Sequence, residues 1–137
     1  VLKKGEKYSH AMKNLDVKIP AYVSSWADKY FHQSAYGMPF NFPSEKIIKF
    51  FSTFKPGKTV VLYRGINKYN NELSMIVSWT YDREIAKNYI KEGGKIIERF
   101  FSPKEILLDT TRLNKNQKKL LGYDYAIDDK EVLILMK

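Results

Sequence analysis

Three groups of polar side chains interrupt segments that are otherwise rich in β-forming residues. Arg64 ends one such run, Ser78 and Thr80 lie two residues apart in a second, and Glu131 opens a third. Because side chains alternate along a strand, Ser78 and Thr80 are expected to share a face. A polar group at the edge or mouth of a sheet needs a partner. One cleft that received all three segments would satisfy them together.

Such a cleft would contain a cation, two hydroxyls and a carboxylate, and each has a chemical use. An arginine grips a diphosphate through its fork of N–H donors. Small hydroxyls can orient a carboxylate or a sugar. A carboxylate beside a ribose stabilises the oxocarbenium ion that forms when a glycosidic bond breaks. Taken singly, each residue is equally typical of a solvated strand position.

The elements that must position these residues are short strands preceded by helices. Strands are expected over residues 59–64, 75–80, 95–101, 106–108 and 131–136, and helices after Pro20, after Ser44 and over residues 81–90. Helices first and strands afterwards indicate an α+β fold with mainly antiparallel or mixed sheets. We expect a single domain over residues 1–137, with a helical part at about 1–57 and a strand-rich part at about 58–137.

Spacing also predicts which residues form the core. Tyr22, Trp26 and Tyr30, and with them Val23 and Ala27, recur at spacings of three and four, which is one face of a helix. Trp79 lies between Ser78 and Thr80 and should therefore point to the opposite face, into the core.

Composition excludes several classes of site. The 137 residues include no Cys, which rules out disulfides, zinc–thiolate sites and thiol nucleophiles. The two histidines, His10 and His32, are too few for a His-rich metal site, although Asp128, Asp129 and Glu131 remain an alternative metal or turn cluster. No Gly-x-Gly-x-x-Gly motif occurs, so a Rossmann site is not expected. No apolar run approaches the ~20 residues that span a bilayer.

The net charge of +9 is unevenly distributed. Residues 1–68 hold 12 Lys and Arg against 4 Asp and Glu, whereas residues 69–137 hold 12 against 11. A basic first half suits phosphates, acidic partners or nucleic acid, and equally a well-solvated lysine surface.

Three motifs, in chain order, resemble those of the mono-ADP-ribosyltransferases of the arginine–serine–glutamate class, which includes the C3-like and binary actin-modifying toxins. They are Tyr63-Arg64-Gly65, Ser78-Trp79-Thr80 and Asp129-Lys130-Glu131. Residues 102–109 also resemble the strand and turn before that family's final loop. The likeness covers residues 58–137 and implies a two-sheet core with NAD as substrate and no metal.

The resemblance implies a role for each matching residue. Glu131 would be the catalytic carboxylate, Ser78 would hydrogen-bond it, and Arg64 would contact the phosphate or ribose of NAD. Tyr63, Gly65 and Thr80 would complete the cofactor-binding wall.

The acceptor side of the site is less closely matched. Asp129 stands where the family has Glu or Gln to engage the acceptor, and its side chain is one methylene shorter than Glu. Tyr123 and Tyr125 would lie in the acceptor-recognition loop. The implied acceptor is a macromolecule, foremost a protein that would be modified on an arginine, with nucleic acid as the other choice.

Two further functions stay open at this stage. One is a non-catalytic basic module that binds nucleic acid or an acidic protein, and the other is an inactive relative that uses the cleft to bind a partner. The sequence implies a monomer with no membrane segment. A toxin or a phage or bacterial effector is an analogy of class only, and the compartment is left open.

Overall fold

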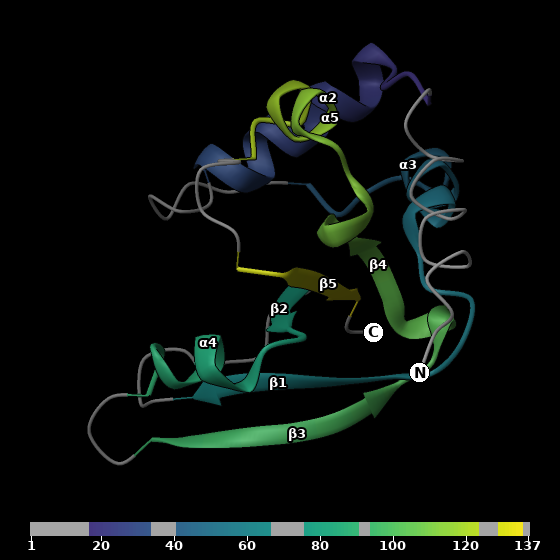
Figure 1. Ribbon diagram of the computed structural model, residues 1–137. Coiled ribbons are helices and arrows are strands. Elements are labelled where there is room, and N and C mark those ends of the chain that lie inside the picture. Colours follow the sequence, from purple (N-terminus) through teal and green to yellow (C-terminus); the bar gives the residue numbers. More distant parts are fainter. Residues whose placement is uncertain (1–16, 34–40, 67–75, 91–93, 124–128, 136–137) are drawn as a thin grey trace. The chain divides into compact units, whose positions relative to one another are not determined.

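The computed structural model describes residues 17–33, 41–66, 76–90, 94–123 and 129–135 (Figure 1). The chain divides into two compact units. One comprises residues 1–54 and 112–127, and the other comprises residues 55–111 and 128–137. The first unit is helical in its described part and the second contains the sheet, so each is described by itself.

The helical unit is built from α2 (Ala21–Asp28), α3 (Glu45–Phe51) and α5 (Lys115–Leu120), with a π-helical turn at Lys29–Gln33 and a 3-10 turn at Ser52–Phe54. Ser44 caps α3 as predicted, because its side chain accepts a hydrogen bond from the Ile47 N–H. Residues 112–127 join this unit, which the predicted helical part at 1–57 did not include.

The aromatic stripe of α2 differs in part from the prediction. Trp26 is buried, stacks on Tyr30 with ring centroids 5.5 Å apart, and donates its indole N–H to the Asn41 carbonyl at 2.6 Å. Tyr22, however, is 38% exposed, and the Lys46 Nζ lies 4.1 Å from its ring centroid. Val23 and Ala27, which were predicted on the same face, are fully buried. The buried face is therefore centred one position further along the helix than Tyr22.

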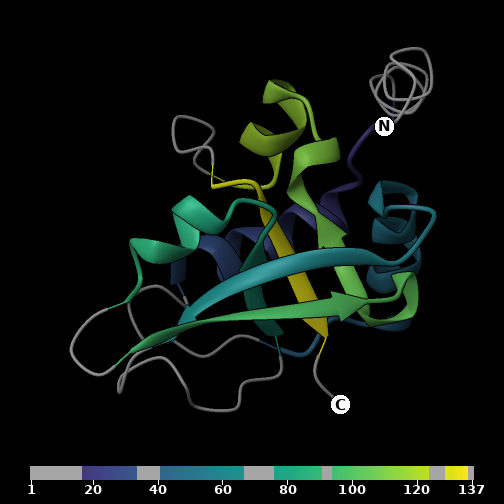
Figure 2. The ribbon, with the colours of Figure 1, turned by 60° about the horizontal axis from the view of Figure 1, so that its bottom comes forward.

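The second unit is an antiparallel sheet. Its strands are β1 (Val60–Ile66), β2 (Ile76–Thr80), β3 (Lys95–Phe101), β4 (Ile106–Asp109) and β5 (Glu131–Leu135), in the spatial order β3-β1-β2-β5-β4. All four neighbouring pairs are antiparallel. Figure 2 shows β1 and β3 side by side as the longest pair. The α+β class and the antiparallel pairing are therefore confirmed.

The sheet differs from the predicted two-sheet core in one respect. The described strands form one open sheet, but its two parts are joined weakly. β1 pairs with β3 over seven residues, whereas its register with β2 is a single pair, Tyr63 with Thr80. The strands separate beyond that pair, which leaves room for side chains between them.

One face of the sheet carries an apolar core. Its buried members are Leu62, Trp79, Phe101, Ile106, Val132 and Ile134. Trp79 is 7% exposed and lies edge-on to Phe101, with ring centroids 4.8 Å apart, so its predicted core position is confirmed. The neighbours of Trp79 in the chain, Ser78 and Thr80, consequently face the other side.

The helix α4 (Arg83–Lys87) lies between β2 and β3 in the chain and contacts β1. Asp82 caps it by accepting the Glu84 N–H at 2.9 Å. Gly65 of β1 makes this approach possible, because a Cβ at that position would lie 2.0 Å from the Ala86 carbonyl oxygen. The helix thereby comes to lie beside the face that carries Ser78 and Thr80.

Candidate active site

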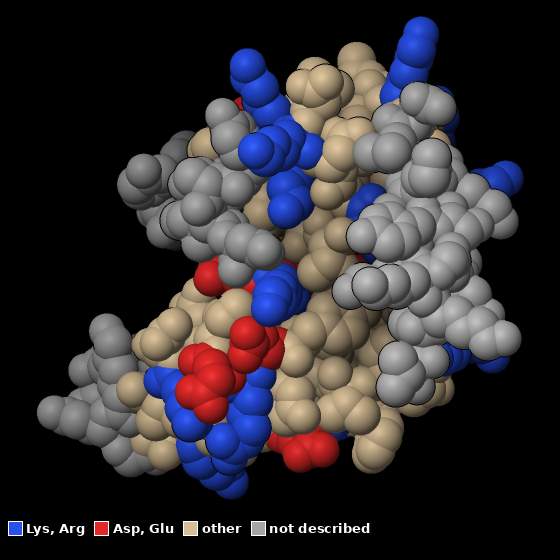
Figure 3. All heavy atoms as spheres, in the orientation of Figure 1, with Lys and Arg blue, Asp and Glu red and all other residues tan. Residues whose placement is uncertain are grey.

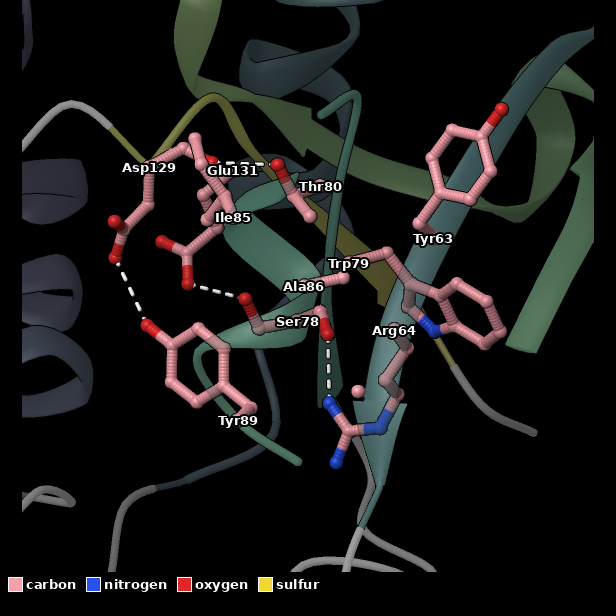
Figure 4. Close-up of a pocket in the computed structure, with 11 residues that line it drawn as sticks. Tyr63, Arg64, Ser78, Trp79, Thr80, Ile85, Ala86, Tyr89, Asp129 and Glu131 are labelled. Atoms are coloured by element: carbon pink, nitrogen blue, oxygen red, sulfur yellow. Dashed lines mark hydrogen bonds between the residues drawn. The ribbon is translucent and has the colours of Figure 1, made fainter. Parts of the chain in front are cut away.

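A pocket of about 190 Å³ opens where β1 and β2 separate (Figure 4). All of its lining residues belong to the sheet unit. Seven of the lining residues were predicted from the sequence as catalytic, cofactor-binding or acceptor-binding residues: Tyr63, Arg64, Gly65, Ser78, Thr80, Asp129 and Glu131. The remaining lining residues are Trp79 of β2 and Ile85, Ala86 and Tyr89 on or just after α4.

Arg64 bridges the two strands where their ladder stops. Continuing the Tyr63–Thr80 register would place Gly65 opposite Ser78. Instead, Nη1 of Arg64 donates to the Ser78 carbonyl oxygen at 2.6 Å. A side-chain N–H thus bonds a carbonyl oxygen at the point where the β1–β2 pairing stops, and this hydrogen bond holds the guanidinium at the pocket wall.

Ser78 and Glu131 meet across neighbouring strands. Thr80 pairs with Glu131 in the β2–β5 register, so Ser78, two residues earlier, shares the face of Glu131. The Ser78 hydroxyl donates to Oε2 of Glu131. Figure 4 shows both side chains pointing toward one another and away from the indole of Trp79.

Glu131 lies in an environment that disfavours its charge. Burial raises its pKa above the ordinary value, and the nearby Asp129 carboxylate raises it further, while the hydrogen bond from Ser78 acts in the opposite direction. A carboxylate whose pKa is perturbed by burial and by a neighbouring charge, in a pocket, is a candidate for a functional group.

Asp129 is fixed by its backbone as well as its side chain. Thr80 Oγ1 donates to the Asp129 carbonyl oxygen at 2.7 Å. The following residue, Lys130, has a φ of 48°, in the left-handed region that side-chain-bearing residues rarely adopt. This turn precedes β5, and Asp129 and Glu131 lie on either side of it.

Tyr89 is the pocket residue whose role the sequence did not reveal. Its hydroxyl donates to Oδ2 of Asp129 at 3.0 Å. The Tyr89 side chain is partly buried, with 47% of its surface exposed. This partial burial, the hydrogen bond to Asp129 and the charges of Asp129 and Glu131 together raise the pKa of Tyr89 to about 12. The sequence predicted only that Tyr89 lies in the helix over residues 81–90; the fold brings its hydroxyl to Asp129.

The two tyrosines predicted for the acceptor loop lie outside the described part of the sheet unit. Tyr123 belongs to the helical unit, where its ring lies 5.0 Å from that of Phe31 and Lys118 Nζ lies 5.7 Å from its centroid. Tyr125 lies outside the described residues, as does Asp128 of the alternative metal cluster.

The described residues contain no group of three or more His, Cys, Asp or Glu side chains arranged to hold a metal ion. Among the helices in this part of the chain, none is long and apolar enough to cross a membrane.

No protein-family model, curated protein or solved structure matches the chain. The chemistry of the pocket is therefore inferred from its own residues and their geometry.

Proposed function

We propose that the chain is a mono-ADP-ribosyltransferase of the arginine–serine–glutamate class. It would cleave NAD at the nicotinamide–ribose bond and transfer ADP-ribose to a macromolecular acceptor. One observation carries the proposal: the Ser78 hydroxyl donates to Glu131 in a pocket whose wall also holds the Arg64 guanidinium. These residues come from three strands and are separated by up to 67 positions in the chain, yet they line one pocket.

Glu131 is the group that stabilises the reaction's cationic transition state. Burial makes the bare carboxylate unfavourable, as the raised pKa of Glu131 indicates. Positive charge that develops on the ribose offsets this cost only as the bond to nicotinamide lengthens. The interaction is therefore stronger in the transition state than in the free protein, which is the condition for acceleration.

The bonds and protons balance in a simple displacement. The C1′–N bond breaks and its electron pair leaves with nicotinamide, which becomes neutral. A lone pair of the acceptor forms the new bond to C1′, and the acceptor's proton passes to a base, for which the Asp129 carboxylate is in place beside Glu131. Water as the acceptor gives ADP-ribose by hydrolysis.

The pocket size fits one end of the dinucleotide. Its volume of about 190 Å³ is below the roughly 300–1,000 Å³ of sites that enclose a whole drug-sized ligand. We assign it to nicotinamide and its ribose. Arg64, at the wall formed by β1, is the cation available to the adjoining phosphate.

The proposal is tested by measuring whether label from NAD becomes attached to a macromolecule. The purified chain is incubated with NAD labelled in its adenylate part and with a bacterial or a eukaryotic lysate. Label should become attached to a macromolecule, and Glu131→Gln should abolish the attachment. Glu105→Gln is the matched control, because Glu105 is an exposed carboxylate in the turn before β4 and should transfer like wild type. Equal transfer by wild type and E131Q would refute the proposal.

A second candidate is a basic module that binds nucleic acid. It is favoured by the lysines of α5, Lys115, Lys118 and Lys119. Lys and Arg side chains gather in the upper part of the view in Figure 3, over α5. Nucleic-acid binding that weakens steeply with salt, without any release of nicotinamide from NAD, would favour this candidate.

A further inference from the structure

We propose that Tyr89 is a positioning residue that holds the Asp129 carboxylate for the acceptor and so decides how much ADP-ribose goes to the acceptor rather than to water. This inference rests on the proposed function and deepens it. It is carried by the hydrogen bond from the Tyr89 hydroxyl to Oδ2 of Asp129, 3.0 Å long, in the pocket that contains Glu131 (Figure 4).

The position of Tyr89 is fixed by the close packing of the end of α4 against Gly65 of β1. An ideal Cβ on Gly65 would lie 3.1 Å from the Tyr89 Cβ and closer still to the Ala86 carbonyl oxygen. The bare backbone at Gly65 therefore lets the end of α4 and the following turn lie against β1. The Tyr89 ring can then reach across the pocket mouth to Asp129.

Asp129 is held from two directions. Thr80 fixes its backbone through the carbonyl oxygen, and Tyr89 fixes one oxygen of its side chain. The charge of the neighbouring Lys130 is directed elsewhere, because its Nζ lies 3.4 Å from Oδ2 of Asp82 at the start of α4. The Asp129 carboxylate is thus presented to the pocket mouth by a neutral donor.

A tyrosine suits this task because it remains a donor. The raised pKa of Tyr89, about 12, keeps its proton on the hydroxyl throughout the ordinary pH range. The short side chain of Asp129 has few conformations, and one hydrogen bond is enough to fix the direction of its carboxylate. Without that bond the carboxylate is free to rotate, and its two oxygens no longer meet the acceptor in one geometry.

The test separates transfer from hydrolysis. Tyr89→Phe removes only the hydroxyl and keeps the ring. In one reaction with labelled NAD and lysate, both the label attached to macromolecules and the nicotinamide released are measured. The ratio of attached label to released nicotinamide should fall by about three- to tenfold in Y89F, the effect expected for loss of one partly exposed hydrogen bond. Tyr22→Phe, a hydroxyl removal at an exposed site in the helical unit, should leave the ratio unchanged.

A double-mutant cycle shows whether Tyr89 acts through Asp129. Asp129→Ala should lower the same ratio, and adding Y89F to D129A should lower it little further. Once the macromolecule that receives the label has been purified, its Michaelis constant as acceptor should be higher for Y89F than for wild type, because the acceptor then meets a carboxylate with no fixed direction.

The other possible results refute either the proposed function or the role of Tyr89 alone. If wild type releases no nicotinamide, the proposed function fails and this inference fails with it. If wild type transfers label but Y89F keeps the wild-type ratio, or lowers it equally in the D129A background, only the role of Tyr89 is refuted. Nicotinamide release by wild type with no attached label would also refute it, since no acceptor would then be engaged.

Discussion

Replacing Gly65 by alanine should destabilise the protein and disturb the pocket together. The added Cβ would lie 2.0 Å from the Ala86 carbonyl oxygen and 3.1 Å from the Tyr89 Cβ. The first atom is backbone, so no side-chain rotation relieves the contact. The end of α4 must move away from β1 by about 1.4 Å or more to restore an ordinary van der Waals distance.

The expected cost is that of overpacking, about 1–3 kcal/mol. In a chain of this size each kcal/mol lowers the melting temperature by roughly 3–6 °C. The displacement also carries Tyr89 away from Asp129, so G65A should lower the ratio of attached label to released nicotinamide in the direction of Y89F.

The assay is urea unfolding of G65A beside a matched glycine variant. Gly57→Ala is the control, because a Cβ at Gly57 has nothing within 4 Å. G57A should be neutral or slightly stabilising, since alanine restricts the unfolded chain. If G65A were as stable as G57A, the close approach of α4 to β1 would be wrong, and the positioning of Tyr89 would be wrong with it.

Two more predictions concern stability. Asn114→Ala removes the capping box, in which the side chains of Asn114 and Gln117 each accept a hydrogen bond from the other's backbone N–H. The substitution should lower the free energy of unfolding in urea by about 0.5–2 kcal/mol. An unchanged urea midpoint would contradict this. Glu131→Gln should gain stability over wild type as pH rises. The raised pKa of Glu131 means that the unfolded chain ionises first, near the ordinary value of 4.5, so wild type loses stability as pH rises through the folded-state pKa. The difference in unfolding free energy should be small near about pH 4 and larger near about pH 7; a difference that shrinks with pH would refute the assigned burial.

The sequence predicted the strands well because their residues are locally consistent. All five expected strands occur, with ends that differ by at most two residues where both ends are described. Alternation then fixed which residues share a face, so that Ser78 and Trp79 were assigned to opposite faces correctly.

Several features depended on contacts that a local pattern does not contain. The exposure of Tyr22 depends on which helix face meets α3, and helical spacing alone allowed a neighbouring face. The short helix α5 is begun by the Asn114–Gln117 capping box rather than by an apolar stripe, and it was not predicted. That β1 and β2 share one residue pair follows from how the strands diverge, which composition does not specify.

The contact between Tyr89 and Asp129 also could not be predicted from a local sequence pattern. Tyr89 meets Asp129 across 40 positions of the chain, through the packing of α4 on Gly65. Sequence reasoning placed Tyr89 in a helix and assigned the acceptor role to Tyr123 and Tyr125. Tyr123 packs on Phe31 in the helical unit, and Tyr125 lies outside the described residues, so that prediction stays untested.

The central claim is that Glu131, held by Ser78, cleaves the bond between nicotinamide and ribose. The most direct measurement is nicotinamide release from NAD by the purified chain without any acceptor, comparing wild type, E131Q and the control E105Q. Wild type and E105Q should release nicotinamide slowly and at equal rates, and E131Q should release none above the uncatalysed background. Release by E131Q at the wild-type rate, or no release by any of the three, would contradict the account.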